Sequence, residues 1–202
     1  MMQPALMHDC SDKGIWAPNE AFYIHAMLFN TRSAVVSIEW VSTALEQISR
    51  DLSGDALAQL DRRAMLGELQ NIIVQAAALS RYFWPARQGH EARAKQLRAA
   101  FDVADDNPLK NRDLRKEIEH FDEKLDAYLS DGIAGYTLPE FVGTLPESDG
   151  MTAHIFRAYY LEDGLFEILG KRYEIEPLAH EILRLHDRLL LADRNGGRFG
   201  DS

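Results

Sequence analysis

Between residues 19 and 53 the chain carries apolar side chains at helical spacing. A helix is predicted to begin near Asn19, where Pro18 suits a first-turn position, and to end by Ser53 and Gly54. The apolar positions that indicate it are Phe22, Ala26, Phe29, Val36, Trp40, Leu45 and Ile48. The pattern therefore predicts one long helix near the N-terminus.

Three more helices are predicted before residue 131. One spans Asp55 to Trp84, because apolar residues three or four apart continue until Pro85 stops the helix, and with the first helix it should form an antiparallel hairpin. A shorter helix covers Glu91 to Val103. The fourth runs from Pro108, behind an Asn107 N-cap, to about Ser130. Its apolar stripe consists of Leu114, Ile118, Phe121, Leu125 and Leu129.

The chain changes character after this helix. From Asp131 to Gly150, glycines and prolines break every regular period, which indicates a long loop or linker. Ala153 to Tyr160 and Leu165 to Ile175 are rich in aromatic and β-branched residues, and the intervening Leu161–Gly164 ends in Asp-Gly, so a β-hairpin is predicted. A last helix is expected from Glu176 to just before Asn195.

These elements predict a mainly α fold. A four-helix bundle domain (18–131) would be followed by an appended unit (151–194) made of the small β-hairpin and the C-terminal helix. The composition agrees with a folded domain, since 46% of the residues are hydrophobic and 27% are charged. We find no internal repeat and no low-complexity segment.

Charge and cysteine content restrict the function classes. The formal net charge of −10 disfavours a broad basic surface that coats nucleic acid, so any such contact would be local. The single cysteine, Cys10, supports neither a disulfide framework nor a thiolate zinc site, which favours a reducing compartment. Because the N-terminus has no basic stretch followed by an apolar core, and no run of about 18 apolar residues occurs, we expect a soluble cytoplasmic protein without membrane contact.

Metal and cofactor sites are not expected. Glu117-x-x-His120 resembles half of a di-iron motif, but no other histidine follows a glutamate at this spacing. His180 and His186 are six residues apart, which rotates them by about 120° around a helix, so they cannot bind one ion from one face. Neither a Gly-rich phosphate loop nor a Gly-x-Ser-x-Gly elbow occurs.

The fourth predicted helix carries the residues with the most suggestive chemistry. Arg115 and His120 lie on its charged part, and arginine offers a permanently charged fork for phosphate oxygens, whereas histidine titrates near neutral pH. An arginine followed by a histidine on a helix of an α-helical bundle resembles the HEPN superfamily (higher eukaryotes and prokaryotes nucleotide-binding). The resemblance of the run 114–126, together with the bundle before it, covers about 110 residues.

Many members of that family are metal-independent ribonucleases. The resemblance implies a homodimer in which Arg115 clamps a phosphate and His120 acts as the acid–base at a composite cleft, with Arg112, Lys116 and Glu119 in support. It also implies RNA cleavage or binding in a defence, toxin or stress context.

Two features depart from the family pattern and keep other functions open. Lys116 stands where a small polar residue usually follows the arginine, and four acidic residues surround His120. Arg115 and Lys116 could instead pair with Glu119 and its neighbours on a solvated helix face. The alternatives are a non-catalytic HEPN-like module that binds a nucleotide or a protein partner, and a small-molecule sensor or structural accessory protein.

Overall fold

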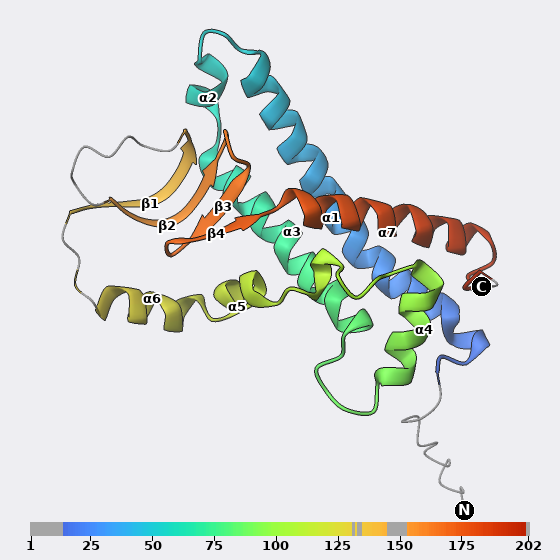
Figure 1. Ribbon diagram of the computed structural model, residues 1–202. Coiled ribbons are helices and arrows are strands. Elements are labelled where there is room, and N and C mark those ends of the chain that lie inside the picture. Colours follow the sequence, from blue (N-terminus) through green and yellow to red (C-terminus); the bar gives the residue numbers. More distant parts are fainter. Residues whose placement is uncertain (1–13, 131, 133–134, 145–152, 201–202) are drawn as a thin grey trace, which may run out of the picture.

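The computed structural model describes residues 14–130, 132, 135–144 and 153–200. Figure 1 shows long helices crossing beside a small sheet. The helices are α1 (Glu20–Arg50), α2 (Asp55–Gln59), α3 (Arg62–Phe83), α4 (Glu91–Phe101), α5 (Asp113–Glu119), α6 (Phe121–Ser130) and α7 (Glu176–Arg194). The strands are β1 (Tyr136–Gly143), β2 (Ala153–Tyr160), β3 (Leu165–Ile168) and β4 (Lys171–Glu174). Short 3-10 turns occur at Ala17–Asn19 and Pro108–Lys110.

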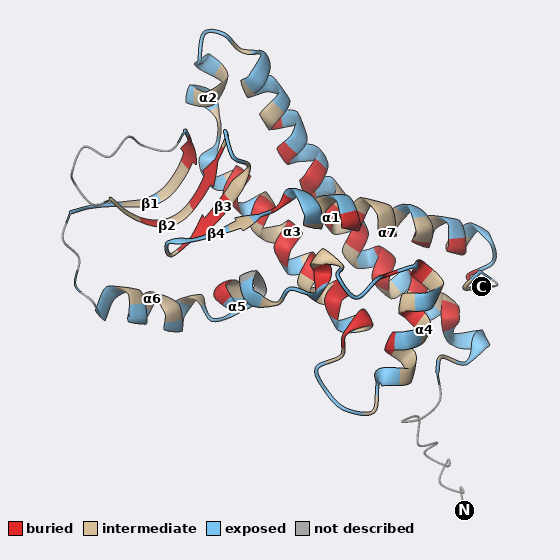
Figure 2. Ribbon diagram, in the orientation of Figure 1, coloured by how far each residue is buried: buried red, intermediate tan, exposed pale blue. Residues whose placement is uncertain are grey.

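Helices α1, α3 and α7 build the hydrophobic core, and Figure 2 shows their buried faces where they cross. Polar side chains fix how these helices align. The Ser37 hydroxyl of α1 donates to Glu68 of α3 and accepts from Asn71 Nδ2 at 2.8 Å. Between α1 and α7, Thr31 Oγ1 lies 2.9 Å from His186 Nδ1. Such pairs favour one register, because a buried hydroxyl without a partner would destabilise the fold.

The predicted first helix is present as α1, but none of the seven apolar positions that predict it is fully buried, and four are exposed. The exposed fractions are 74% for Phe22, 75% for Phe29, 65% for Val36 and 38% for Trp40. The residues that α1 buries instead are Ile24, Met27, Leu28, Thr31, Ala34, Ile38 and Val41. Helix α1 thus has apolar residues on two opposite faces, and the sequence pattern marked the outer one.

Two predicted helices are interrupted. The helix expected from Asp55 to Trp84 is divided into α2 and α3, because the Asp61 side chain accepts a hydrogen bond from Ala64 N and starts a new helix. The helix expected from Pro108 to Ser130 is divided into a 3-10 turn, α5 and α6, with a break at His120. The predicted third helix is present as α4. The bundle of four long helices is therefore not confirmed.

A four-stranded sheet occupies the C-terminal part of the chain, in the order β1-β2-β3-β4. The predicted hairpin is present as the antiparallel pair β2 and β3, but its second strand, expected from Leu165 to Ile175, is divided by a turn at Leu169 and Gly170 into β3 and a further antiparallel strand, β4. The prediction of a structureless loop from 131 to 150 is wrong, because β1 lies within it and pairs with β2 in parallel. Pro139 is compatible with β1 because β1 is an edge strand.

The sheet and α7 complete the same core. Val142, Tyr159, Phe166 and Ile168 belong to the cluster that contains the residues of α1 and α3. The predicted C-terminal helix is confirmed as α7, which packs against α1. The division into 18–131 and 151–194 stays a prediction. Among the described helices, none is long and apolar enough to cross a membrane.

Candidate functional site

Helix α5 carries most of the residues that the HEPN resemblance singles out. It packs on α3, on a different side of that helix from α1. Small side chains of α3, including Ala77 and Ala78, allow this close approach and leave a groove of about 140 Å³ that is also lined by Ile118 and Glu119 of α5. Arg115 lies within α5, but its side chain is outside the described residues.

His120 occupies the C-cap of α5, where its backbone N–H still donates to Lys116 O. Its imidazole is more than half exposed, and Nδ1 lies 3.7 Å from Glu123 Oε2 of α6. An exposed imidazole beside a carboxylate can exchange protons with solvent or with a bound ligand. The backbone leaves helical geometry at His120, so the helix that the sequence predicts as continuous is divided there into α5 and α6.

The three supporting residues have separate structural roles. Arg112 donates a hydrogen bond to the backbone carbonyl of Trp84 and ties the start of α5 to the end of α3. Glu119 accepts a hydrogen bond from Arg81 Nη2 of α3 at 2.8 Å. Lys116 Nζ lies 3.9 Å from Asp113 on the same helix. Lys116 pairs with a neighbour on its own helix, which is the type of contact that a solvated helix face would make. Arg112 has a structural role, because it holds the start of α5 against the end of α3.

Glu117 is the buried acid of this region, and sequence reasoning did not single out its structural role. Its Oε1 accepts a hydrogen bond from Lys171 Nζ of β4 at 2.6 Å and lies 3.5 Å from Lys124 Nζ of α6. This carboxylate therefore connects α5, α6 and the sheet. Next to it, the Arg157 guanidinium of β2 lies 4.1 Å from the centre of the Phe121 ring, a cation–π contact that fixes the start of α6.

The described part of α5 and α6 does not form a ready anion site within one chain. Its cations are matched by carboxylates, and no group of three or more metal-ligating side chains occurs among the described residues. Phosphate binding here would need the Arg115 side chain or a second protomer. The two side chains of the Glu-x-x-His pattern have different partners: Glu117 contacts two lysines, whereas His120 lies beside Glu123.

The exposed apolar face of α1 is the second candidate site, and we call Phe22, Phe29, Val36 and Trp40 the α1 stripe. On a helix these positions fall within about 40° of one line and extend over about 27 Å. The line is opposite the face that carries Ile24, Thr31 and Ile38 in the core. Beside its C-terminal end, Trp40, Thr43 and Leu60 contribute to an open groove of about 820 Å³ between α1 on one side and α2 with the α2–α3 junction on the other.

Comparison of this chain with protein-family models, curated proteins and solved structures gives no significant match. The resemblance to the HEPN superfamily therefore rests on its own residues.

Proposed function

We propose that the chain is a non-catalytic HEPN-like interaction module that pairs with a second copy of itself through the α1 stripe. The observation that supports this most is the exposure of two phenylalanines, a valine and a tryptophan along one line of the longest described helix. Scattered exposed apolar residues are normal on protein surfaces, but these four are spaced seven, seven and four residues apart and therefore form one row on one face, as the apolar rows of pairing helices do.

The pattern of the α1 stripe is self-complementary. If two α1 helices pair antiparallel about a two-fold axis between residues 32 and 33, Phe29 of each copy lies beside Val36 of the other. Phe22 then reaches the level of Thr43, where the open groove beside Trp40 can receive its ring. The same side chains are used twice, which is what a two-fold interface requires.

Charged side chains flank the α1 stripe and affect the same pairing. No member of the stripe is charged, but Arg32 of the two copies would lie about 1.5 Å apart along the axis on one side of the helix pair, so this like-charged pair opposes the pairing. In the antiparallel arrangement, His25 of one copy is about 1.5 Å along the axis from Glu39 of the other and on the same side of the helix pair. A protonated His25, which already lies 3.3 Å from Asp193, would be attracted by this glutamate. The self-complementary apolar positions are therefore what favours a second copy over an unrelated partner.

The experiment replaces one member of the stripe with a charge. Phe29→Glu would place two carboxylates near the two-fold axis, whereas the isolated chain tolerates it because Phe29 is 75% exposed. We expect the dimer dissociation constant to rise about a hundred-fold or more, because central aromatic residues dominate interface energies. Leu191→Glu on α7 is the matched control, since Leu191 is 59% exposed and outside the stripe.

Sedimentation velocity at tens of micromolar gives the readout. The wild-type chain and Leu191→Glu should sediment as dimers and Phe29→Glu as a folded monomer, whose melting temperature should be lower because association no longer stabilises it. A monomeric wild-type chain at this concentration contradicts the proposal. A Phe29→Glu variant that remains dimeric would show that association uses another face.

The metal-independent ribonuclease is the second candidate. It is favoured by the exposure of the His120 imidazole five residues after Arg115. A composite site needs the two copies of this pair to meet, but α5 packs on α3 and α3 lies between α5 and α1. Pairing through α1 therefore does not bring the two histidines together, and the ribonuclease would need a different interface.

A further inference from the structure

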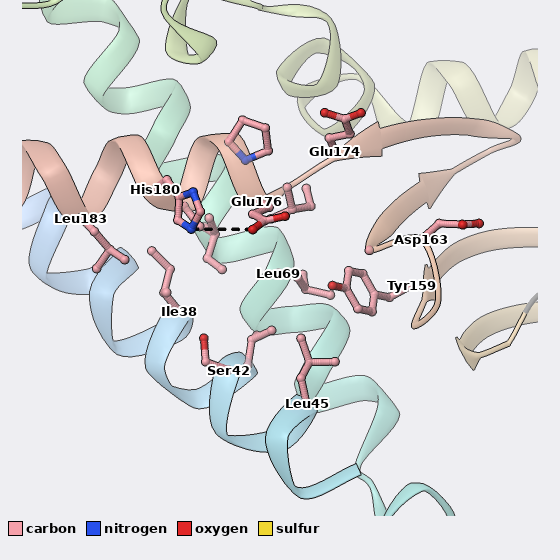
Figure 3. Close-up of a pocket in the computed structure, with 16 residues that line it drawn as sticks. Ile38, Ser42, Leu45, Leu69, Tyr159, Asp163, Glu174, Glu176, His180 and Leu183 are labelled. Atoms are coloured by element: carbon pink, nitrogen blue, oxygen red, sulfur yellow. Dashed lines mark ion pairs between the residues drawn. The ribbon is translucent and has the colours of Figure 1, made fainter. Parts of the chain in front are cut away.

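A cavity of about 740 Å³ lies between α1, α3, the start of α7 and the turn that joins β2 to β3 (Figure 3). The residues that line it include none from α5 and none from the α1 stripe. Its inner wall is apolar and comes from both long helices, with Val41 and Leu45 on α1 and Leu69 and Ile72 on α3. This volume lies within the range of sites that enclose small organic molecules, which are typically apolar with a few polar groups.

Tyr159 provides a polar group inside the cavity. The residue is 7% exposed, and its hydroxyl makes no hydrogen bond with any described residue. In Figure 3 its ring extends from β2 toward Leu69 and the space between the helices. Burial, followed by the negative charge of Glu176, raises the pKa of Tyr159, so the hydroxyl stays protonated and can donate. The hydroxyl oxygen is not among the fully buried side-chain atoms that lack a partner, so it is open to the cavity and can bond with water or with a ligand there.

The rim of the cavity is acidic. Asp163, Glu174 and Glu176 are among the lining residues, which include no lysine or arginine, but Figure 3 draws the carboxylates of Asp163 and Glu174 pointing away from the space between the helices. Figure 3 shows Glu176 directed toward His180, and the two side chains lie 3.8 Å apart at the mouth. The side chains of Glu176 and His180 are 80% and 72% exposed, so this carboxylate acts through water and gives a modest preference for cations over anions.

We infer that this cavity binds an organic cation with an extended apolar body. The apolar body packs between Val41 and Ile72, the positive group lies at the rim beside Glu176, and a polar atom of the ligand can pair with the Tyr159 hydroxyl. A metal ion does not fit this site, because the described residues hold no group of three metal ligands. The inference is independent of self-association, since no residue of the α1 stripe lines the cavity.

Two fluorescent probes test the inference on the full chain. Pyrenebutylamine and pyrenebutyrate share one apolar body and differ in the sign of their charge. We expect the amine to bind at least about ten-fold more tightly, with affinity measured by fluorescence anisotropy. Glu176→Gln should weaken amine binding about five-fold, as expected for one partly exposed ion pair, and should leave the binding of butyrate unchanged or stronger.

Two further variants complete the test. Ser42→Trp fills the cavity from α1 and should abolish binding of the amine, whereas Glu162→Gln removes a charge next to the cavity without changing its lining and should have little effect. Thermal unfolding checks that each variant is folded. Equal affinity for the two probes, no binding of the amine, or binding that survives Ser42→Trp would overturn the inference.

Discussion

Replacing Glu117 with glutamine is expected to loosen α5 from the sheet. The carboxylate is buried, whereas its partners Lys171 and Lys124 are each about half exposed and can return to water when it is lost. The expected loss for Glu117→Gln is therefore about 1–2 kcal/mol of the free energy of unfolding. Lys171→Met should lose more, about 2–3 kcal/mol, because it leaves a buried carboxylate with the more distant lysine.

The pH dependence gives this prediction a direction. Burial raises the pKa of Glu117, but the hydrogen bond and charge of Lys171 and the charge of Lys124 outweigh it, so the pKa lies below its ordinary value of 4.5. A carboxyl group whose pKa is lowered by folding stabilises the protein above its unfolded pKa and loses this contribution as the pH falls through the folded pKa. The difference between the wild-type chain and Glu117→Gln should therefore be full at neutral pH and shrink below about pH 4.

Urea unfolding at neutral pH and at about pH 3 measures both effects. Glu123→Gln is the control, because that carboxylate is exposed on the neighbouring helix and its loss should change stability by less than about 0.5 kcal/mol. A Glu117→Gln variant as stable as the wild-type chain at neutral pH would refute the reasoning. So would a difference that stays the same in acid.

Two other predictions concern the candidate sites. If Arg115 and His120 cut RNA as the resemblance implies, cleavage should survive EDTA and fall by about 10²- to 10⁴-fold in His120→Ala; an absence of cleavage in the wild-type chain would favour the non-catalytic module. Tyr159→Phe should change the free energy of unfolding by less than about 0.5 kcal/mol, because the hydroxyl has no partner in the described part of the chain; a loss above about 1 kcal/mol in a denaturation curve would indicate an intramolecular bond.

The positions of the main helices could be predicted from periodicity, but their orientation could not. Phe22, Phe29 and Val36 repeat every seven residues, so they indicate a helix as strongly as the core residues do. The core face contains Thr31 and Ala34, which a search for large apolar residues passes over. A polar residue becomes compatible with a core when a partner such as His186 arrives from a distant helix, and this contact is not visible in local sequence.

Strand β1 was missed because glycine and proline dominated the interpretation of its region. Tyr136, Leu138 and Phe141 supply strand-forming side chains, but Pro139 interrupts them and is acceptable at an edge. The candidate site on α5 was found from its residue types, whereas the break at His120 was not, because apolar spacing continues through it to Phe121 and Leu125. The cavity depends on four distant segments, so no local pattern indicates it.

The order of the sheet has a consequence for the behaviour of the chain at high concentration. Its two outer strands are β1 and β4, whose unpaired backbone groups could recruit a strand from another molecule. Pro139 lacks an N–H for such a bond, and β4 has four residues, three of them charged: Lys171, Arg172 and Glu174. Both borders therefore resist templated fibril growth, so crowding of this protein should favour discrete complexes over cross-β aggregates.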